Sequence, residues 1–371
     1  MDDPQNPYAG AHRHPKGPGD ARPTALQIVK DNDRTSKLQD LVILITGCSS
    51  GLGVETAPAL ATTGATLYLT ARNLTKAREA LGPEILSNSN SCPGRVHLLE
   101  LNLDSLASVR ACASAFLAQS GGKLNVLVNN AGIRHVPFSK TEDGFERHWG
   151  VNHLGHFLLM RLLLPGLQGS STMEFQSRVV VLSSTASRNE DISFDDVNLE
   201  RPGAYTPPRG YAQSKLANVY MATEITRRYG IGSGNDTANS TGTSTSNSAQ
   251  ASRPGVWGLA VHPGGIRTGL QAPSGGLREV LTWYYMRNIM RVLNYMKSPE
   301  QGAATTVLAA VGKRFEGRGA MYLEDCGEAV PVKKGWGLID PGYVPGRTDN
   351  EVDAKRCWEM SCKMVGIEDE G

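Results

Sequence analysis

The strongest indication of the fold is the segment TGCSSGLG (46–53), which follows the apolar run LVILIT (41–46) and precedes an amphipathic stretch. Between a buried strand and a helix, three glycines have separate uses. Gly47 permits a tight turn, Gly51 lets the backbone approach a pyrophosphate, and Gly53 allows the helix to pack closely on the strand. The free N–H groups at the helix start then face the phosphates. The segment predicts a dinucleotide site, with a merely flexible turn as the alternative.

Short apolar runs alternate with amphipathic stretches from residue 41 onward, which is typical of βαβ units on a parallel sheet. The runs are almost continuous in Val, Ile and Leu, as expected for strands covered on both faces. The fold class is therefore α/β, a single doubly wound (Rossmann-like) parallel sheet of about seven strands flanked by helices. The expected strands are LVILIT (41–46), ATLYLTA (65–71), RVHLLEL (95–101), LNVLVNN (124–130), RVVVLSS (178–184) and VWGLAVH (256–262).

Composition and charge exclude several classes of protein. The 371 residues include 38 Lys and Arg against 36 Asp and Glu, a net charge of +2. Such a balance provides no basic field for nucleic acid or an anionic membrane. The six cysteines have neither CxxC nor metal-ligand spacing, which favours a reduced, intracellular chain without a metal site. The one close pair, Cys357 and Cys362, is expected to pack inside a helix.

We expect no targeting or membrane segment. Residues 1–20 are polar and rich in Pro and Gly, unlike a signal peptide. The most apolar stretch, 156–167, is interrupted by Arg161 and Pro165 and is far shorter than the ~20 residues of a membrane span. The C-terminal IEDEG carries no retention or peroxisomal address. The simplest expectation is a cytoplasmic protein.

The chain is expected to form one folded domain over residues 37–368. Residues 1–36 are expected to be a flexible tail, with one short helix in TALQIVKD (24–31). Segment 233–252 has no apolar residue larger than Ala, so it predicts a disordered insertion. Pro58 follows the first turn of the first domain helix, where it should kink the helix or cost a hydrogen bond.

The end of the second strand indicates which dinucleotide binds. An acidic residue there would bind the ribose 2′-OH of NAD, whereas a basic residue accommodates the 2′-phosphate of NADP. The strand ends in LTARN, which places Arg72 at this point without a neighbouring carboxylate. This favours NADP(H), and a solvated surface arginine is the alternative.

The segment GYAQSKLAN (210–218) places Tyr211 and Lys215 one turn apart on a helix. A tyrosine with a pKa of about 10 needs help to act as an acid or base near neutral pH. An ammonium ~4 Å away, at an effective dielectric of ~20, supplies on the order of 4 kcal/mol, or nearly three pKa units. On its own, such a Tyr–Lys pair is usually only part of a helix surface, so its assignment to catalysis depends on the remaining motifs.

Polar motifs at further strand ends complete the pattern. RVVVLSS ends in Ser183 and Ser184 at the carboxyl end of a strand, where open α/β sheets bind ligands. A serine hydroxyl there can donate a hydrogen bond to a substrate carbonyl oxygen. The other motifs are NNAG (129–132), VNHLGHF (151–157) with Asn152, and HPGGIRT (262–268) with Thr268, which can bond a carboxamide.

This combination resembles the short-chain dehydrogenase/reductase family, and most of all its retinol-dehydrogenase-like branch and fungal relatives. The resemblance runs from Lys37 to Ile367, apart from the insertion. The stretches that carry it are SKTEDGFERHWGVNHLGHFLL (139–159), GYAQSKLANV (210–219), HPGGIRT (262–268) and CWEMSCKMVGI (357–367).

The resemblance implies a catalytic tetrad of Asn152, Ser184, Tyr211 and Lys215. Tyr211 would donate or accept the proton, and Ser184, which matches the family position better than Ser183, would orient the carbonyl. Lys215 would bind the nicotinamide ribose and lower the Tyr211 pKa, while Asn152 would hold a relay water. The cofactor-binding residues implied are Gly47, Ser49, Ser50, Gly51, Leu52, Gly53, Arg72, Asn102, Leu103, Asn130, Ala131, Gly132, Tyr211, Lys215, Pro263, Ile266 and Thr268.

The expected reaction is hydride transfer between NADP(H) and a carbonyl/alcohol pair on a lipophilic small molecule, in a fungal secondary-metabolite pathway. Members of the family range from monomers to tetramers, which is compatible with a homodimer. Segment 278–296 is expected to form a lid helix whose aromatic residues favour an apolar ligand, with ordinary packing as the alternative. Two departures are Asn102, where many members have Asp, and the missing N-terminal anchor of retinol-type members. The alternative function is a cofactor-binding protein without redox activity: a sensor, a scaffold, or an epimerase or cyclase helper.

Overall fold

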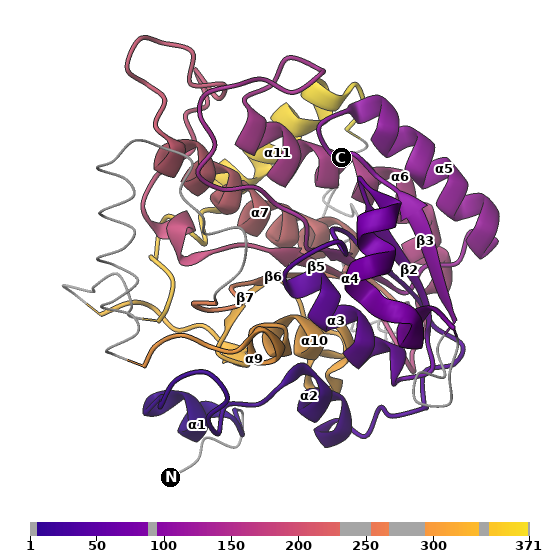
Figure 1. The fold of residues 1–371 in the computed structure, drawn as a ribbon. Coiled ribbons are helices and arrows are strands. Elements are labelled where there is room, and N and C mark those ends of the chain that lie inside the picture. The colour runs from indigo at the N-terminus through magenta and orange to yellow at the C-terminus, as the bar shows by residue number, and fades with distance from the viewer. Residues whose placement is uncertain (1–5, 88–94, 231–253, 267–293, 334–340, 370–371) are drawn as a thin grey trace, which may run out of the picture.

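The structure, a computed structural model, describes residues 6–87, 95–230, 254–266, 294–333 and 341–369 (Figure 1). The predicted insertion (233–252), Thr268 and the predicted lid helix up to residue 293 lie outside the described residues.

One sheet runs through the described part of the chain in the order β3-β2-β1-β4-β5-β6-β7-β8 (Figure 1). Strands β1 to β7 pair in parallel, and β8 pairs with β7 in the antiparallel direction. The predicted α/β fold is confirmed, and the first six strands lie where the apolar runs predicted them. The strands are β1 (Val42–Ile45), β2 (Thr66–Ala71), β3 (Val96–Glu100), β4 (Val126–Asn129), β5 (Ser177–Leu182), β6 (Val256–Val261), β7 (Met321–Glu324) and β8 (Gly327–Glu328).

The strand order reverses beside β1, which pairs with β2 on one edge and with β4 on the other. Ile43 of β1, for example, lies opposite Leu67 of β2 and Val126 of β4. The connections on the two sides of β1 therefore diverge. This leaves a crevice outside the carboxyl ends of the strands, the place where doubly wound sheets bind their ligands.

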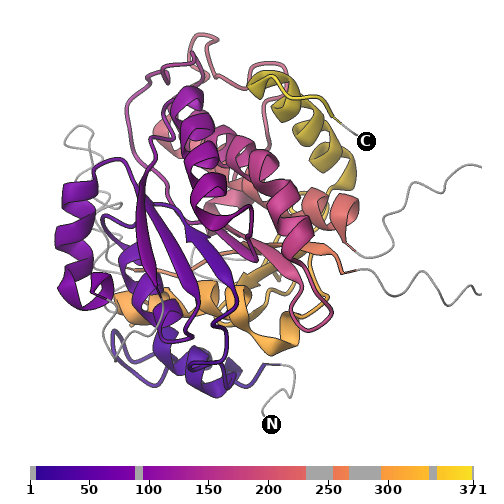
Figure 2. The same cartoon turned by 90° about the vertical axis from the view of Figure 1, so that its right-hand side faces the viewer.

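Helices cover both faces of the sheet, as Figure 2 shows from a second direction. Helices α5, α6, α7 and α11 lie on one side, and α2, α3 and α10 lie on the other. The helices are α1 (Ala9–Arg13), α2 (Ala25–Asp31), α3 (Leu52–Ala61), α4 (Leu74–Leu86), α5 (Leu106–Ser120), α6 (Gly155–Ser170), α7 (Pro207–Tyr229), α9 (Pro299–Gly302), α10 (Ala304–Val311) and α11 (Glu351–Val365).

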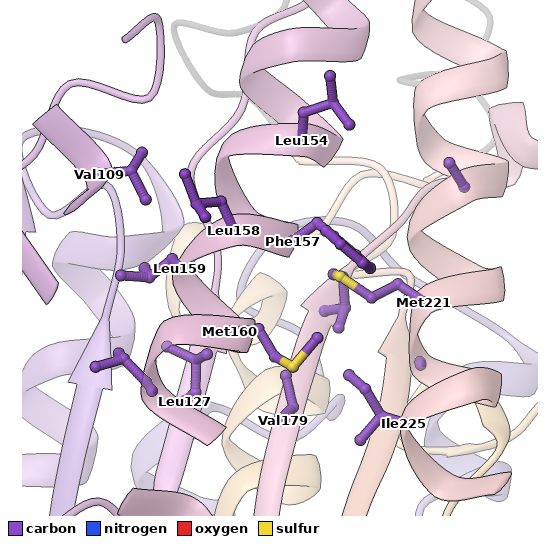
Figure 3. Close-up of a cluster of buried hydrophobic side chains, with 14 of the residues drawn as sticks. Val109, Leu127, Leu154, Phe157, Leu158, Leu159, Met160, Val179, Met221 and Ile225 are labelled. Carbon is purple, nitrogen blue, oxygen red and sulfur yellow. The ribbon is translucent and has the colours of Figure 1, made fainter. Parts of the chain in front are cut away.

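Two hydrophobic cores lie between the sheet and these helix layers. Because successive strand side chains point to opposite faces, Leu44 enters one core and Ile43 the other. Figure 3 shows part of the first core, where Met160 of α6 and Met221 of α7 pack above Val179 of β5. Burial on both faces explains why the strand sequences are continuously apolar rather than alternating.

The N-terminal segment differs from the expected flexible tail, because residues 6–36 pack on the domain. Helix α2 confirms the helix predicted at 24–31 and lies beside α10 (Figure 1). The buried guanidinium of Arg22 donates hydrogen bonds to the carbonyls of Tyr295 (3.0 Å), Met296 (2.7 Å) and Gly17 (3.0 Å). A polar composition predicts disorder only when such distant backbone acceptors are absent, which local sequence cannot reveal.

Two smaller predictions concern helices. Helix α3 continues through Pro58, so the cost of this proline is the missing hydrogen bond to the carbonyl of Val54. Cys357 and Cys362 are both buried in α11, as predicted. Within the described ranges, no helix combines the length and apolar character needed to cross a bilayer.

Candidate active site

A cavity of about 530 Å³ opens at the carboxyl ends of the strands. It brings together most of the residues that the sequence predicted for cofactor binding, although they come from six separate segments. The predicted residues that line it are Gly47, Ser49, Ser50, Gly51, Leu52, Arg72, Asn102, Leu103, Asn130, Ala131, Gly132, Tyr211, Lys215 and Pro263.

The glycine-rich loop has a shape that side chains would obstruct. Gly47 has φ +76°, and a Cβ there would lie 2.8 Å from the Cα of Ala131. A Cβ on Gly53 would lie 2.4 Å from the carbonyl oxygen of Gly47. Gly51, with φ 66°, is the N-cap of α3 and supplies no side-chain cap to the first turn. The open N–H groups of that turn therefore fit a pyrophosphate.

Thr46, which the sequence analysis did not identify, joins this loop to the loop after β4. Its hydroxyl oxygen accepts hydrogen bonds from the backbone N–H groups of Asn130 (2.9 Å) and Ala131 (3.0 Å). The side chain of Asn130 donates back to the Thr46 carbonyl oxygen (2.7 Å). The signal was present, because TG and NNAG both follow buried strands that pair with one another.

His156 connects Thr46 to Asn152. The Nδ1 atom lies 3.0 Å from the Asn152 carbonyl oxygen, which can only accept, so Nδ1 carries the proton. Burial lowers the pKa of His156 to about 4, so the ring is neutral near pH 7 and its Nε2 is an acceptor. The Thr46 hydroxyl, 2.9 Å away, therefore donates to Nε2.

Asn152 lies on a π-helical segment, Trp149–Leu154, of the kind that often occurs at functional sites. Its amide oxygen accepts from the Ile133 N–H (2.8 Å), and its amide nitrogen donates to the Ile133 carbonyl (3.1 Å). The same nitrogen donates to the hydroxyl of Ser214 on α7 (3.0 Å). Asn152 therefore holds the loop after NNAG against the helix that carries Tyr211.

Tyr211 and Lys215 are both buried on α7, with the Lys215 Nζ 5.7 Å from the centre of the Tyr211 ring. This ammonium donates to the carbonyl of Leu182 (2.9 Å), and burial lowers its pKa to about 8. Burial raises the pKa of Tyr211, while the charge of Arg134 and a hydrogen bond with Ser184 act to lower it. A second cation, the Arg134 guanidinium, thus lies beside the phenol, with its central carbon 5.2 Å from the ring centre.

The two serines at the end of β5 have different partners. Ser183 donates its hydroxyl to the carbonyl of Lys215 (2.7 Å), so that hydroxyl is committed to helix α7. Ser184 accepts from the N–H of Ala186 (3.2 Å) and hydrogen-bonds Tyr211. Ser184 is therefore the serine beside the phenol, although Ser183 also lines the cavity.

Arg72 lies exposed at the rim of the cavity, directly after β2, and no hydrogen bond or ion pair holds it to any other described residue. Asn102 follows the neighbouring strand β3, where its side-chain oxygen accepts from the Asp104 N–H (3.2 Å). A basic group free to reach into this end of the cavity fits the 2′-phosphate of NADP.

Some site residues are placed differently from the prediction or were missed by it. Ile266 is buried beside Gly302 and is not among the residues that line the cavity. The ion pair of Arg147 with Asp104 (3.0 Å) lines the cavity and was not predicted. Asp104 follows the end of β3, which is the signal that could have identified it.

Comparison with known sequences identifies relatives. The family described as short chain dehydrogenase matches residues 41–194. "Short-chain dehydrogenase/reductase prx1" of Penicillium roqueforti is 45% identical over 97% of this chain and 95% of its own length. "Oxidoreductase calI" of Penicillium decumbens is 39% identical over 98% of both chains. Human retinol dehydrogenase 12 is 35% identical over 89% of this chain and 88% of its own.

Solved structures show the same architecture. A crystal structure of an uncharacterized protein from Mycobacterium paratuberculosis has a TM-score of 0.60 at 29% identity, covering 91% of this chain and 97% of its own. The complex of RhlG with NADP from Pseudomonas aeruginosa has a TM-score of 0.54 at 19% identity, covering 78% of this chain and 96% of its own. The latter likeness concerns the fold alone.

Proposed function

Because this chain belongs to the short-chain dehydrogenase/reductase family, we propose that it is an NADP(H)-dependent oxidoreductase that interconverts a carbonyl and an alcohol on a lipophilic small molecule. The observation that carries the proposal is that Tyr211 and Lys215 line the same cavity as a glycine-shaped phosphate loop, while Ser184 hydrogen-bonds Tyr211. The hydrogen bonds of Asn152 tie these parts together.

The proposed roles follow from what each side chain contacts. Tyr211 donates its phenolic proton to the carbonyl oxygen during reduction and removes it from the alcohol during oxidation. Ser184, which hydrogen-bonds Tyr211, orients the same oxygen. Lys215 contributes a buried ammonium to the ribose side of the cavity, and Asn152 holds the loop between them. When bound, NADP(H) supplies or accepts the hydride.

We propose NADP(H) rather than NAD(H) because of Arg72. It is exposed at the carboxyl end of β2 on the rim of the cavity, and the charge of a guanidinium favours a phosphate over a hydroxyl. The remaining cofactor contacts are proposed for the predicted residues of the domain that spans 37–368, including Ile266 and Thr268.

The substrate class rests on the relatives. One of them carries the name retinol dehydrogenase, and two are fungal enzymes of the same family. The name retinol dehydrogenase supports a lipophilic carbonyl or alcohol, and the fungal source of the other two relatives is compatible with the proposed place in fungal secondary metabolism. Cytoplasmic location and a homodimer complete the proposal, and fractionation and light scattering test them.

Steady-state assays with a panel of carbonyl compounds test the proposal. We expect NADPH oxidation with at least one lipophilic aldehyde or ketone, and loss of turnover in Tyr211→Phe while NADPH still binds. Tyr229→Phe, at the far end of α7, is the matched control and should behave as wild type. NADPH binding without turnover of any compound would contradict the proposal and favour a sensor or scaffold. A Tyr211→Phe variant that keeps a tenth of wild-type kcat, a loss of only ~1.4 kcal/mol, would exclude Tyr211 as the acid.

A further inference from the structure

The guanidinium of Arg134 lies over the ring of Tyr211, with its central carbon 5.2 Å from the ring centre. Arg134 directly follows Ile133, whose backbone N–H and carbonyl both bind the Asn152 side chain. The backbone that carries Arg134 is therefore held by the same residue that braces helix α7. This placement is a built feature of the site rather than a chance approach of a surface side chain.

Arg134 has no competing partner in the described part of the chain. Its Nε is buried without a hydrogen bond, and no carboxylate there forms an ion pair with it. The buried side of this half-exposed guanidinium faces the electron-rich ring of Tyr211. The charge of Arg134 is thus directed at the residue proposed to transfer the proton.

The other titratable groups around Tyr211 come from four elements. His148, just before the π-helical segment, has its ring centre 6.1 Å from that of Tyr211, and its Nδ1 lies 2.9 Å from the Glu146 carboxylate. That carboxylate also accepts from the backbone N–H groups of residues 148 and 149, so it is fully engaged. His135 lies beside Arg134, and burial lowers its pKa to about 4.

Two further groups are His262, which directly follows β6, and Lys215 on α7. Burial lowers the pKa of His262 to about 3, so its ring is neutral near pH 7. Lys215 is cationic near pH 7, but its pKa of about 8 means that it loses its charge as the solution becomes alkaline. A guanidinium stays protonated over the whole accessible range. Arg134 is therefore the cation that remains beside Tyr211 where a tyrosine titrates.

We propose that Arg134 is a positioning residue for the carbonyl–alcohol reaction, and that its charge stabilises the phenolate of Tyr211 relative to the phenol. The inference rests on the proposed function. In reduction, the O–H bond of Tyr211 breaks, its proton passes to the carbonyl oxygen, and the electron pair stays on the phenolate oxygen. The carbonyl carbon receives its hydride from NADPH. Arg134 itself transfers nothing; it favours the charged state that Tyr211 reaches.

The size of the effect follows from Coulomb's law. A unit charge ~5–7 Å from the phenolate oxygen, at an effective dielectric of ~20, would shift the Tyr211 pKa by about two units. Arg134 is only half-buried, so solvent screening reduces this value, and we expect a shift of about one unit.

The test is a pair of pH profiles of kcat/KM, one for carbonyl reduction and one for alcohol oxidation, with wild type and Arg134→Gln. Reduction requires the phenol, so the variant should keep its reductase activity to a pH about one unit higher than wild type. Oxidation requires the phenolate, so its rising limb should move up by the same unit, with a rate near pH 7 about tenfold lower. A merely structural lesion would lower both activities and move neither limb.

Two further variants complete the design. Arg134→Lys keeps the charge and should restore both limbs to within a few tenths of a unit of wild type. Arg356→Gln is the matched control, because Arg356 lies 4.2 Å above the centre of the Phe194 ring, which cannot titrate, and its loss should leave both profiles unchanged. If Arg134→Gln folds poorly, the titration of Tyr211 can be followed by tyrosinate absorbance. The difference between wild type and Tyr211→Phe gives the Tyr211 signal, and the pH profile of Arg134→Lys is compared with it.

The outcomes separate this inference from the function on which it rests. Activity retained by Tyr211→Phe would overturn the proposed function itself. An inactive Tyr211→Phe together with unmoved limbs in Arg134→Gln would overturn the role of Arg134 alone. Equal loss of both activities, without a limb shift and without rescue by Arg134→Lys, would also overturn it.

Discussion

Replacing Gly53 by alanine should weaken NADPH binding and lower stability, although alanine is the better helix former. Gly53 lies in the first turn of α3, and an added Cβ would lie 2.4 Å from the Gly47 carbonyl oxygen and 2.8 Å from the side-chain nitrogen of Asn130. Real Cβ atoms stay at least ~3.0–3.4 Å from such atoms, so the turn must shift by roughly 0.6–1 Å. Overpacking of this kind costs about 1–3 kcal/mol, which exceeds the gain of up to ~1 kcal/mol in helix propensity.

Gly169→Ala provides the matched control, because Gly169 is also a helical glycine, near the end of α6, and a Cβ there meets nothing within 4 Å. It should leave stability unchanged or raise it by up to ~1 kcal/mol. Thermal denaturation and a fluorescence titration with NADPH measure both variants. For Gly53→Ala we expect a Tm lowered by several degrees. We also expect the Kd for NADPH to rise at least about tenfold, because a loss of ~1.4 kcal/mol in phosphate contacts is enough for a tenfold change. Wild-type Tm and Kd in Gly53→Ala would refute the close-packing argument.

Three other perturbations have defined outcomes. Arg72→Asp should lower the preference for NADPH over NADH, measured as a ratio of kcat/KM, by at least about tenfold; equal use of both cofactors by the wild type would contradict the role of Arg72. Burial raises the pKa of Glu324 to about 7, so the native state binds a proton that the unfolded state loses near its ordinary value, and stability falls as pH rises from about 4.5 to 7. Glu324→Gln should remove up to ~3 kcal/mol of this pH-dependent loss of unfolding free energy, measured by urea unfolding. An unchanged pH dependence would assign the titration to another group. Arg22→Ala should destabilise by about 3 kcal/mol in the same assay, because the carbonyls of Tyr295 and Met296 lose charged donors; a change below ~0.5 kcal/mol would mean that the N-terminal segment detaches at little cost.

Local sequence was sufficient for the framework of the sheet and for the phosphate loop. Buried strands of a parallel sheet are apolar on both faces, so β1 to β6 were visible as continuous runs. The short strands β7 and β8 were not, because two to four residues that end in Glu324 or Glu328 have no periodicity to detect. The glycines at 47 and 53 could be assigned because only one residue type tolerates their close contacts.

Spacing along one helix also predicted the pairing of Tyr211 with Lys215, since residues four apart share a face. It could not show which cation faces the phenol. That depends on Asn152, which anchors Ile133 and so brings Arg134 to 5.2 Å from the Tyr211 ring centre. These residues lie on three separate segments, and their meeting follows from side-chain directions that no local pattern encodes.

The N-terminal segment shows the same division. Its composition predicted a flexible tail, yet Ile28 and Val29 are buried in a core, and Arg22 binds backbone carbonyls on a segment that lies far along the chain. Hydrogen bonding to backbone acceptors needs geometry rather than hydrophobicity, and these acceptors lie 273 and 274 residues away along the chain. Periodicity and glycine placement are properties of neighbours in sequence. The partners of a charged side chain depend on which residues are its neighbours in space.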